Sequence, residues 1–364
     1  MIKKFFFVLM VVVVFTATIF PQYKSKPKNI ILLIGDGFGL SQVSASVLSL
    51  KNDQFKKFHS IGLVNTCSAD NLITDSAAGA TAYATGYQTK NGRISIDVNG
   101  DKLETIIEIA QKKKMSTGII ATSSVTNATP AAFISHSVKR QYEFDIAEQI
   151  VKSKIDILFG AGTDFFLPKE LGGKREDSKN LIDTMKILGY DYITEPDELN
   201  SKKLSKKTFG LFGGYSLPHA DKRNYPLGLL TKAAINYLSN DKDGFFLMIE
   251  GSQIDWAAEQ NDSDYLFAEI SDFNSAIEEA FRFAEKDKNT LVIVTSDHDT
   301  GSAGITNFDK EKNQLILNWA TKHHTANFVG IFSYGPSSNL FNGFLNNYEI
   351  GRKIINLINP LKKF

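Results

Sequence analysis

The sequence contains only one cysteine, Cys67, among its 364 residues. A single cysteine cannot form a disulfide within the chain, and a chain of this length can fold on a hydrophobic core without one. We therefore interpret Cys67 as a small buried hydrophobic residue.

An excess of charge is also missing. The chain has 41 Lys and Arg against 40 Asp and Glu, a formal net charge of +1. A nucleic-acid-binding protein would more often carry a basic excess, so we expect neither a nucleic-acid partner nor a stable membrane partner. Hydrophobic residues at 43% and charged residues at 22% are ordinary globular values, which excludes disordered, collagen-like and multi-span membrane proteins.

The long hydrophobic run of the chain lies at its N-terminus. Lys3 and Lys4 precede an apolar stretch that ends at Phe20, which is the profile of a signal peptide. The stretch is shorter than the roughly 20 residues that a membrane-spanning helix needs. We predict a signal peptide over residues 1–22 and export to the periplasm or the medium, with an uncleaved anchor as the alternative.

Apolar, β-rich runs alternate with longer amphipathic stretches through the rest of the chain. The predicted strands are residues 30–34, 118–122, 155–159, 245–250, 291–295 and 328–332. The clearest predicted helix, residues 264–285, has one apolar stripe at spacings of three and four. Its stripe comprises Leu266, Ile270, Phe273, Ile277, Phe281 and Ala284.

Near-continuous apolar strands separated by helices are typical of a mostly parallel sheet covered on both faces. We therefore predict an α/β fold with a single domain over residues 28–364. The segment 171–207 is rich in Lys, Asp and Glu and has little strand signal. We interpret it as a solvated surface excursion of that domain.

Acids and histidines cluster where the predicted strands end, which is where open parallel sheets bind ligands. They are Asp36, Glu250, Asp255, Glu259, Asp297, His298 and Asp299, with His323 and His324 before the last strand. One acid after a strand would be a helix cap or a turn residue, but this repetition predicts that they converge. Converging carboxylates repel each other unless cations compensate, and oxygen ligands with imidazole suit Zn²⁺, Mg²⁺ or similar ions.

The glycines around Asp36 do not fit a dinucleotide-binding loop. The pattern G-x-G-x-x-G requires glycine at position 40, where Leu40 stands. The carboxylate of Asp36 would also face a pyrophosphate. We interpret Asp36 as a metal ligand between two glycines.

Ser76 opens a run of small residues that can pack a helix tightly against the sheet. A serine in this place is usually an N-cap. Beside a metal cluster, however, its hydroxyl can act as a nucleophile near a helix N-terminus that attracts anions. Arg140 could grip two phosphate oxygens with its planar guanidinium, although a lone arginine is by default a surface residue.

Six segments, in order, carry a resemblance to a known family. They are LLIGDGFG (32–39), TDSAAGATAYATG (74–86), NATPAAFISHSVKR (127–140), EGSQID (250–255), TSDHDTG (295–301) and HHTANFVGIFSYGP (323–336). Together they resemble the nucleophile and metal-binding segments of alkaline phosphatases. The similarity covers nearly all of the chain after residue 22.

The resemblance implies a role for each matching residue. Ser76 would be the nucleophile and Arg140 the phosphate clamp. One metal ion would bind Asp36, Asp297 and His298, and a second would bind Asp255 and His324. A third ion, Mg²⁺ in the family, would bind Asp36, Thr129 and Glu250.

The resemblance also implies an activity. It predicts hydrolysis of small phosphate monoesters at alkaline pH through a phosphoserine intermediate, with two Zn²⁺ ions and one Mg²⁺. The larger members of the family are dimers, and this chain is expected to be a monomer or a homodimer.

Two positions depart from the family pattern. The family has a histidine four residues after Asp255, where this chain has Glu259. Helical spacing puts both side chains on one face, so Glu259 is either a carboxylate ligand or a solvated helix residue. If Glu259 is a ligand, the site that it shares with Asp255 could hold Mg²⁺, Mn²⁺ or Ca²⁺ as well as Zn²⁺. The second departure is Asn127, a neutral amide where the family has Asp or His beside the third ion.

Two other functions stay open at this point. One is a phosphodiesterase of the same superfamily, and the other is a non-enzymatic exported protein that binds metal or phosphate. A sulfatase is excluded because Ala78 and Ala80 stand where that family needs Pro and Arg.

Overall fold

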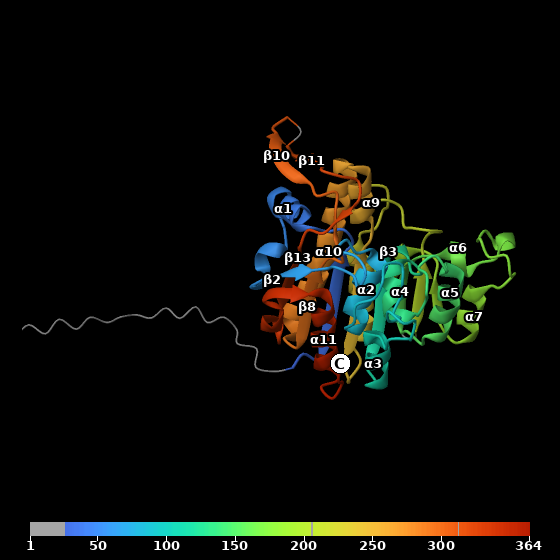
Figure 1. Cartoon of the computed structure of the whole chain (residues 1–364). Helices are drawn as coiled ribbons and strands as arrows, with labels where there is room; N and C mark the ends of the chain where they lie inside the picture. The colour runs from blue at the N-terminus through green and yellow to red at the C-terminus, as the bar shows by residue number, and fades with distance from the viewer. Residues whose placement is uncertain (1–25, 205–206, 312) are drawn as a thin grey trace, which may run out of the picture.

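The computed structural model describes residues 26–364 apart from 205–206 and 312, so the predicted signal peptide over residues 1–22 lies outside it. A ten-stranded sheet forms the centre of the molecule, in the order β14-β2-β13-β8-β1-β7-β3-β4-β6-β5 (Figure 1). Its strands are β1 (Asn29–Gly35), β2 (Ser60–Asn65), β3 (Ser116–Ser124), β4 (Ile157–Ala161), β5 (Asp191–Ile193), β6 (Thr208–Leu211), β7 (Phe245–Gly251), β8 (Thr290–Thr295), β13 (Val329–Tyr334) and β14 (Gly343–Asn346).

Every neighbouring pair in this sheet is parallel except those that β13 makes with β2 and β8. The six predicted strands correspond to β1, β3, β4, β7, β8 and β13, each displaced by at most two residues. The prediction of a mostly parallel sheet is therefore confirmed.

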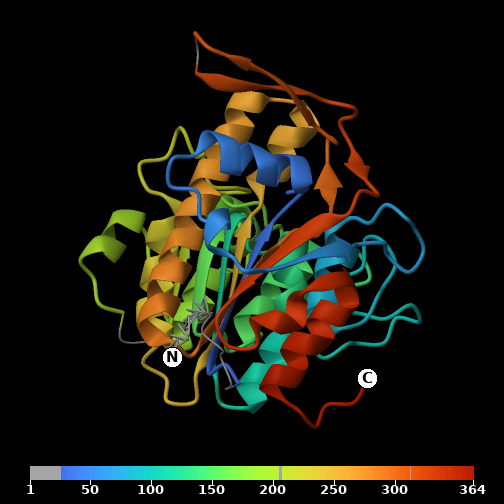
Figure 2. The ribbon, with the colours of Figure 1, turned by 90° about the vertical axis from the view of Figure 1, so that its left-hand side faces the viewer.

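Helices cover both faces of the sheet (Figure 2). They are α1 (Leu40–Ser49), α2 (Ser76–Thr85), α3 (Ile106–Lys112), α4 (Ala128–Ile134), α5 (Glu143–Lys152), α6 (Thr163–Phe166), α7 (Leu181–Ile187), α8 (Leu227–Leu238), α9 (Gln253–Gln260), α10 (Ser263–Asp287) and α11 (Asn347–Ile358). Side chains of β1 alternate between the two cores: Leu32 faces the core of α2, α4 and α11, and Leu33 faces that of α8 and α10. The apolar stripe of the predicted helix 264–285 is buried in α10.

The segment 171–207 is more integrated than predicted. It contributes α7, whose Leu181, Ile182 and Met185 are buried in the core, and the edge strand β5. Burial of these three side chains ties α7 to the core, so the interpretation of this segment as a solvated surface excursion was wrong. The prediction for Cys67 also needs correction, because its side chain is partly exposed.

Two short two-stranded sheets lie beyond the carboxyl ends of the central strands. β10 (Gly304–Asp309) and β11 (Gln314–Asn318) form a hairpin that projects from the molecule above α1 and α9 (Figure 1). β9 (Asp299–Thr300) pairs with β12 (His324–Thr325) and so joins the residues after β8 to those before β13. In the part of the chain that is described, no helix is long and apolar enough to cross a membrane.

Candidate active site

The central strands β8, β1 and β7 are neighbours, and their carboxyl ends meet at one edge of the sheet. Ile34 of β1 pairs with Thr295 of β8 and with Glu250 of β7. The loops that follow these strands therefore bring Asp36, Glu250 and Asp297 to one place. Because β13 runs antiparallel, its starting end, preceded by His324, lies at the same edge.

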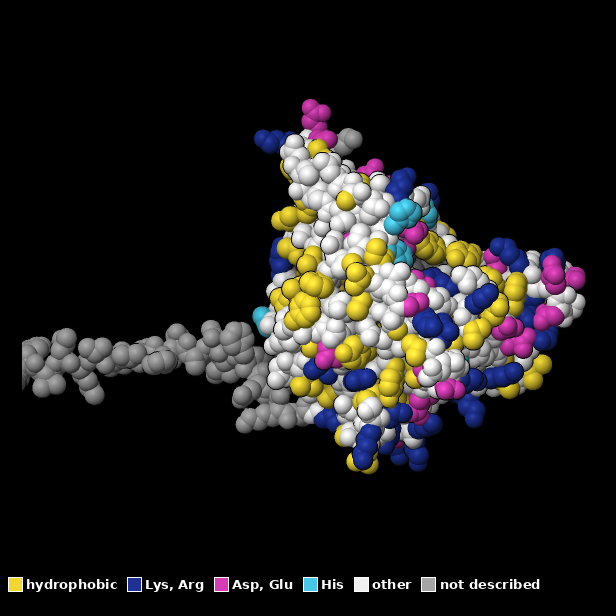
Figure 3. Space-filling model, in the orientation of Figure 1, with side chains coloured by type: hydrophobic (Ala, Val, Ile, Leu, Met, Phe, Trp, Pro, Cys, Tyr) yellow, Lys and Arg dark blue, Asp and Glu magenta, His cyan; other side chains and the backbone are white. Residues whose placement is uncertain are grey.

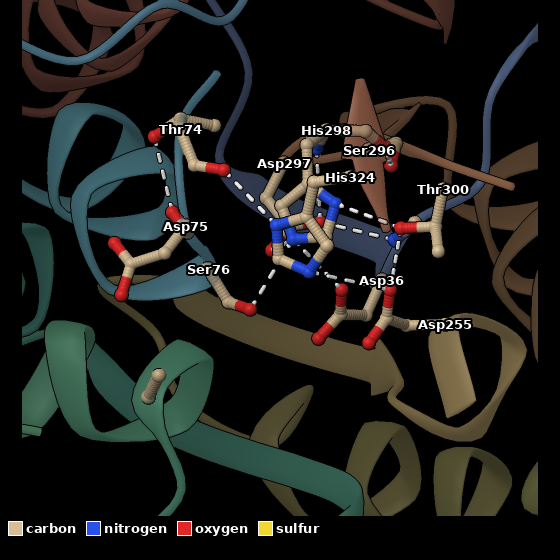
Figure 4. Close-up of polar contacts among 12 residues, drawn as sticks. Asp36, Thr74, Asp75, Ser76, Asp255, Ser296, Asp297, His298, Thr300 and His324 are labelled. Atoms are coloured by element: carbon tan, nitrogen blue, oxygen red, sulfur yellow. Dashed lines mark hydrogen bonds and ion pairs between the residues drawn. The ribbon is translucent and has the colours of Figure 1, made fainter. Parts of the chain in front are cut away.

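Asp36, Asp297 and His298 form a buried group (Figure 4). The Nε2 atom of His298 is 3.3 Å from Oδ1 of Asp36 and 3.4 Å from Oδ2 of Asp297. The backbone N–H of Gly37 donates to Oδ1 of Asp297. One nitrogen and two carboxylate oxygens thus face a common point.

Asp255, His324 and His298 form a second group beside the first. Nε2 of His324 lies 3.6 Å from Oδ1 of Asp255, and the two imidazole rings are stacked with centroids 3.6 Å apart. Thr300 connects the groups, because its hydroxyl donates to Oδ1 of Asp255 and lies 3.2 Å from Nδ1 of His298. Asp255 stands across this site from Ser76 (Figure 4).

The hydrogen bonds of both imidazoles suit metal binding. Nδ1 of His324 lies 3.0 Å from the carbonyl oxygen of Thr74 and can only donate there, so Nε2 keeps its lone pair. The hydroxyl of Thr300 donates its hydrogen bond to Asp255, so it can only accept a hydrogen bond from Nδ1–H of His298. Nε2 of His298 then presents a lone pair toward two carboxylates, an arrangement that a cation stabilises.

Thr129 and Glu250 lie next to this cluster, on α4 and β7. One carboxylate oxygen of Glu250 accepts hydrogen bonds from Ser252 and Ser123. Its other oxygen and the hydroxyl of Thr129 are buried near each other, and neither makes a hydrogen bond of good geometry to a described residue. Oδ1 of Asp36 and Oδ2 of Asp297 are also buried without a hydrogen-bond partner among the described residues. Unpaired buried oxygens are costly, and oxygen ligands are what a hard cation such as Mg²⁺ requires.

Electrostatics lead to the same conclusion. Burial, with the charge of Asp255, raises the pKa of Asp297 to about 7, and burial raises that of Glu250 to about 7. Burial and neighbouring carboxylates also raise the pKa of Asp36, and burial lowers that of His298 well below its ordinary value. The protein thus concentrates buried acids around a neutral imidazole, and bound cations would remove the repulsion.

Ser76 is the first residue of α2, at the edge of this cluster. The helix N-cap is Asp75, whose carboxylate accepts from the N–H of Ala78, so the cap role does not fall to Ser76. The buried Ser76 hydroxyl lies 3.2 Å from Nε2 of His298. Its oxygen therefore faces the two groups of acids and histidines, near the N-terminal end of a ten-residue helix.

Arg140 lies in the turn between α4 and α5 and points back into the site. Its Nη1 donates to Oδ2 of Asp75 at 3.2 Å and lies 3.5 Å from the Ser76 hydroxyl, and its Nη2 donates to Oδ1 of Asn127 at 3.4 Å. Burial alone would lower the pKa of Arg140, but Asp75 and Asp36 raise it on balance. The guanidinium is thus charged and held beside the serine.

The structure does not bring Glu259 into either group of ligands. It lies on α9, one turn after Asp255, and its side chain is exposed at the rim. Burial and the charge of Asp255 raise its pKa, so the two carboxylates are near one another.

Several residues around the site were missed by the sequence analysis. Asp75 orients Arg140, Thr300 bridges Asp255 and His298, and Tyr215 accepts a hydrogen bond from Asn127 at 3.3 Å. Asp75 and Thr300 lie within the segments 74–86 and 295–301, which carry the family resemblance, so the sequence could have indicated them. Tyr215 comes from a loop with no recognisable pattern.

Comparisons with known proteins agree on one family. The family model described as alkaline phosphatase matches residues 27–314. Alkaline phosphatase 3 of Bacillus subtilis is 33% identical, in an alignment that covers 90% of this chain and 88% of that protein. The structure of the alkaline phosphatase from the Antarctic bacterium TAB5 is 37% identical, with a TM-score of 0.86, covering 93% of this chain and 100% of that one. A histidine-to-glutamate variant of the TAB5 enzyme, 37% identical with a TM-score of 0.83 over 92% of this chain and 98% of that one, has Mg bound in its M3 site.

Proposed function

Since the chain belongs to the alkaline phosphatase family, we propose that it hydrolyses phosphate monoesters with Ser76 as the nucleophile. One observation carries this proposal. The Ser76 hydroxyl lies within 3.5 Å of both the Arg140 guanidinium and Nε2 of His298, at the start of a helix. A nucleophile, a phosphate clamp and a buried ligand cluster therefore meet at one point.

The residues divide the work of phosphoryl transfer between them. Arg140 holds two phosphate oxygens with its planar fork, and the N-terminal end of α2 favours the same anion. The Ser76 hydroxyl gives up its proton and its Oγ forms a bond to phosphorus as the bond to the alcohol oxygen breaks on the opposite side, and the departing oxygen takes up a proton from solvent. Water then attacks the phosphoserine, which releases inorganic phosphate and restores the Ser76 hydroxyl. Asp75 and Asn127 keep the Arg140 guanidinium in place during transfer of the phosphoryl group.

The ligand cluster fits the expected ions. We propose that Asp36, Asp297 and His298 hold one Zn²⁺ and that Asp255 and His324, with Glu259 as a further candidate, hold a second ion, expected to be Zn²⁺. Asp36, Thr129 and Glu250 would hold Mg²⁺. When bound, such ions lower the pKa of a hydroxyl or water and neutralise charge on the phosphate.

The proposal is tested by turnover of p-nitrophenyl phosphate by the metal-loaded protein. Ser76→Ala should lower kcat at least about 10³-fold with the fold and metal content retained, because it removes the nucleophile. Ser44→Ala, an exposed serine on α1, is the matched control. Full activity of Ser76→Ala would refute the mechanism. If the parent hydrolyses bis-p-nitrophenyl phosphate faster than p-nitrophenyl phosphate, it is a diesterase. If it binds phosphate but hydrolyses neither ester, it is a non-enzymatic binding protein.

We also propose that residues 1–22 direct export, because Lys3 and Lys4 precede an apolar run of signal-peptide length. Expression of the full chain followed by N-terminal sequencing of the exported protein tests this. Retention of the whole chain inside the cell would contradict it.

A further inference from the structure

A stacked pair of aromatic rings stands at the rim of the site. Tyr215, from the loop between β6 and α8, lies against Trp256 of α9 with ring centroids 5.8 Å apart and an angle of 15° between the rings. Tyr215 is 45% exposed and Trp256 is only partly buried. Exposed aromatic surface beside a site of charged groups needs an explanation, since most aromatic rings are used for packing.

Hydrogen bonds connect this pair to the phosphate clamp. The Tyr215 hydroxyl accepts from Nδ2 of Asn127 at 3.3 Å, and Oδ1 of Asn127 accepts from Nη2 of Arg140 at 3.4 Å. The amide of Asn127 therefore has a fixed orientation between the ring and the guanidinium. Trp256 directly follows Asp255 in α9. The aromatic pair thus spans from the Arg140 side of the site to the Asp255 side.

The Tyr215 ring is also held in place by its surroundings. The carbonyl of Tyr215 accepts from the N–H of Ser124 at 2.7 Å, and Ser216 forms a β-bridge with Ser123 at the end of β3. Phe165 of α6 packs against the Tyr215 ring edge to face, with centroids 6.3 Å apart. A preorganised aromatic surface binds a flat partner at little cost in conformational entropy.

The direction of the reaction decides what would meet this surface. In-line displacement puts the departing alcohol opposite Ser76, and Asp255 of α9 lies across the site from Ser76 (Figure 4). The organic group of a bound ester would therefore leave the site past α9 and its Trp256. On the surface, hydrophobic side chains adjoin the histidines and acids of this region (Figure 3).

We propose that Tyr215 and Trp256 form a subsite for the organic group, so that the enzyme favours monoesters of flat aromatic or heteroaromatic alcohols over those of alkyl alcohols. This inference rests on the proposed phosphomonoesterase function. Offset stacking of one ring on another corresponds to a gain of about 2- to 10-fold in kcat/KM.

The test compares two esters of primary alcohols, 2-naphthylmethyl phosphate and n-butyl phosphate, with the metal-loaded full chain. We expect the parent to prefer the naphthylmethyl ester. Trp256→Ala and Tyr215→Ala should each reduce the ratio of the two kcat/KM values about 3-fold or more. Phe308→Ala, an exposed aromatic residue on the projecting hairpin, is the control and should keep the parental ratio.

Tyr215→Phe separates stacking from positioning. It keeps the ring and removes the hydroxyl that binds Asn127, so the preference for the naphthylmethyl ester should persist. If the ratio stays at the parental value in both alanine variants, or if only the hydroxyl matters, the subsite is refuted while the proposed function stands. If the parent hydrolyses neither ester nor p-nitrophenyl phosphate, the proposed function itself fails.

Discussion

At the scale of single residues, the guanidinium of Arg140 is held from two sides, by Asp75 and Asn127. Arg140→Ala should lower kcat/KM about 10²-fold or more and weaken inhibition by inorganic phosphate, because the same fork grips substrate and product. Arg140→Lys should restore little of the lost kcat/KM, since the ammonium group of lysine cannot bind two phosphate oxygens in parallel as the guanidinium does. Lys139→Ala, the exposed neighbour, is the matched control. Unchanged inhibition by phosphate in Arg140→Ala would show that the arginine does not bind phosphate.

Glu259 is the second residue whose role can be measured directly. If its carboxylate turns inward from the rim to the ion at Asp255 and His324, Glu259→Ala should lose that ion. Glu259→His should shift the preference toward Zn²⁺, because imidazole is a softer, neutral ligand. Metal analysis after dialysis measures both effects, with Glu278→Ala on α10 as a control. Equal metal content and equal preference in Glu259→Ala and the parent would make it a solvated helix residue.

The residues of the site were unequally predictable from the sequence. Asp36, Asp297 and His298 could be found because each follows an apolar strand, and a parallel sheet gathers such positions at one edge. Tyr215 could not be found, since its place depends on a loop bridged to the end of β3 through Ser216. Glu259 shows the opposite case. Helical spacing puts it on the same face of α9 as Asp255, which suggests a ligand, but the structure leaves its side chain at the rim.

At the scale of elements, α2 and α11 approach each other unusually closely. A Cβ atom on Gly351 of α11 would lie 2.5 Å from the carbonyl oxygen of Ala82 and 2.6 Å from that of Tyr83. Gly351→Ala should therefore push α11 off α2 and lower the free energy of unfolding by about 1–3 kcal/mol. Denaturant unfolding measures this, with Gly304→Ala as control because a Cβ there has no neighbour closer than 3.9 Å. Equal stability of the two variants would contradict the close contact.

The elements themselves were predicted best where burial leaves a plain pattern. β1, β7 and β8 are buried along their whole length because both of their faces are covered, and each has an unbroken apolar run. β2 was missed since its buried positions are Ser60, Gly62 and Val64, which form no apolar run, and β5 was missed since it is only three residues long at the edge of the sheet. Short edge strands depend on their neighbours more than on their own residues.

At the scale of the whole molecule, the fold encloses four carboxylates that repel each other. They belong to Asp36, Glu250, Asp255 and Asp297. Each ion present at 1,000 times its Kd would stabilise the protein by about 4 kcal/mol. Loss of one such ion on chelation should therefore lower Tm by about 8 °C, at roughly 2 °C per kcal/mol for a chain of this size, and loss of further ions should lower it more. Calorimetry with and without EDTA measures the shift, which should be smaller in Asp36→Asn. An unchanged Tm in the parent would mean that the acids hold no ion.

The positions of the two tryptophans give this protein a built-in optical reporter. Trp256 follows Asp255 and lies against Tyr215, and Trp319 covers Gly301, where a Cβ would lie 2.5 Å from the indole. The N–H of Gly301 in turn donates to the carbonyl of His323, next to the site. The chain has no other tryptophan. All of its indole emission therefore originates from two residues that adjoin neighbours of the site, Tyr215 and Gly301, so rapid-mixing fluorescence can follow arrival and release of a ligand in the unlabelled protein.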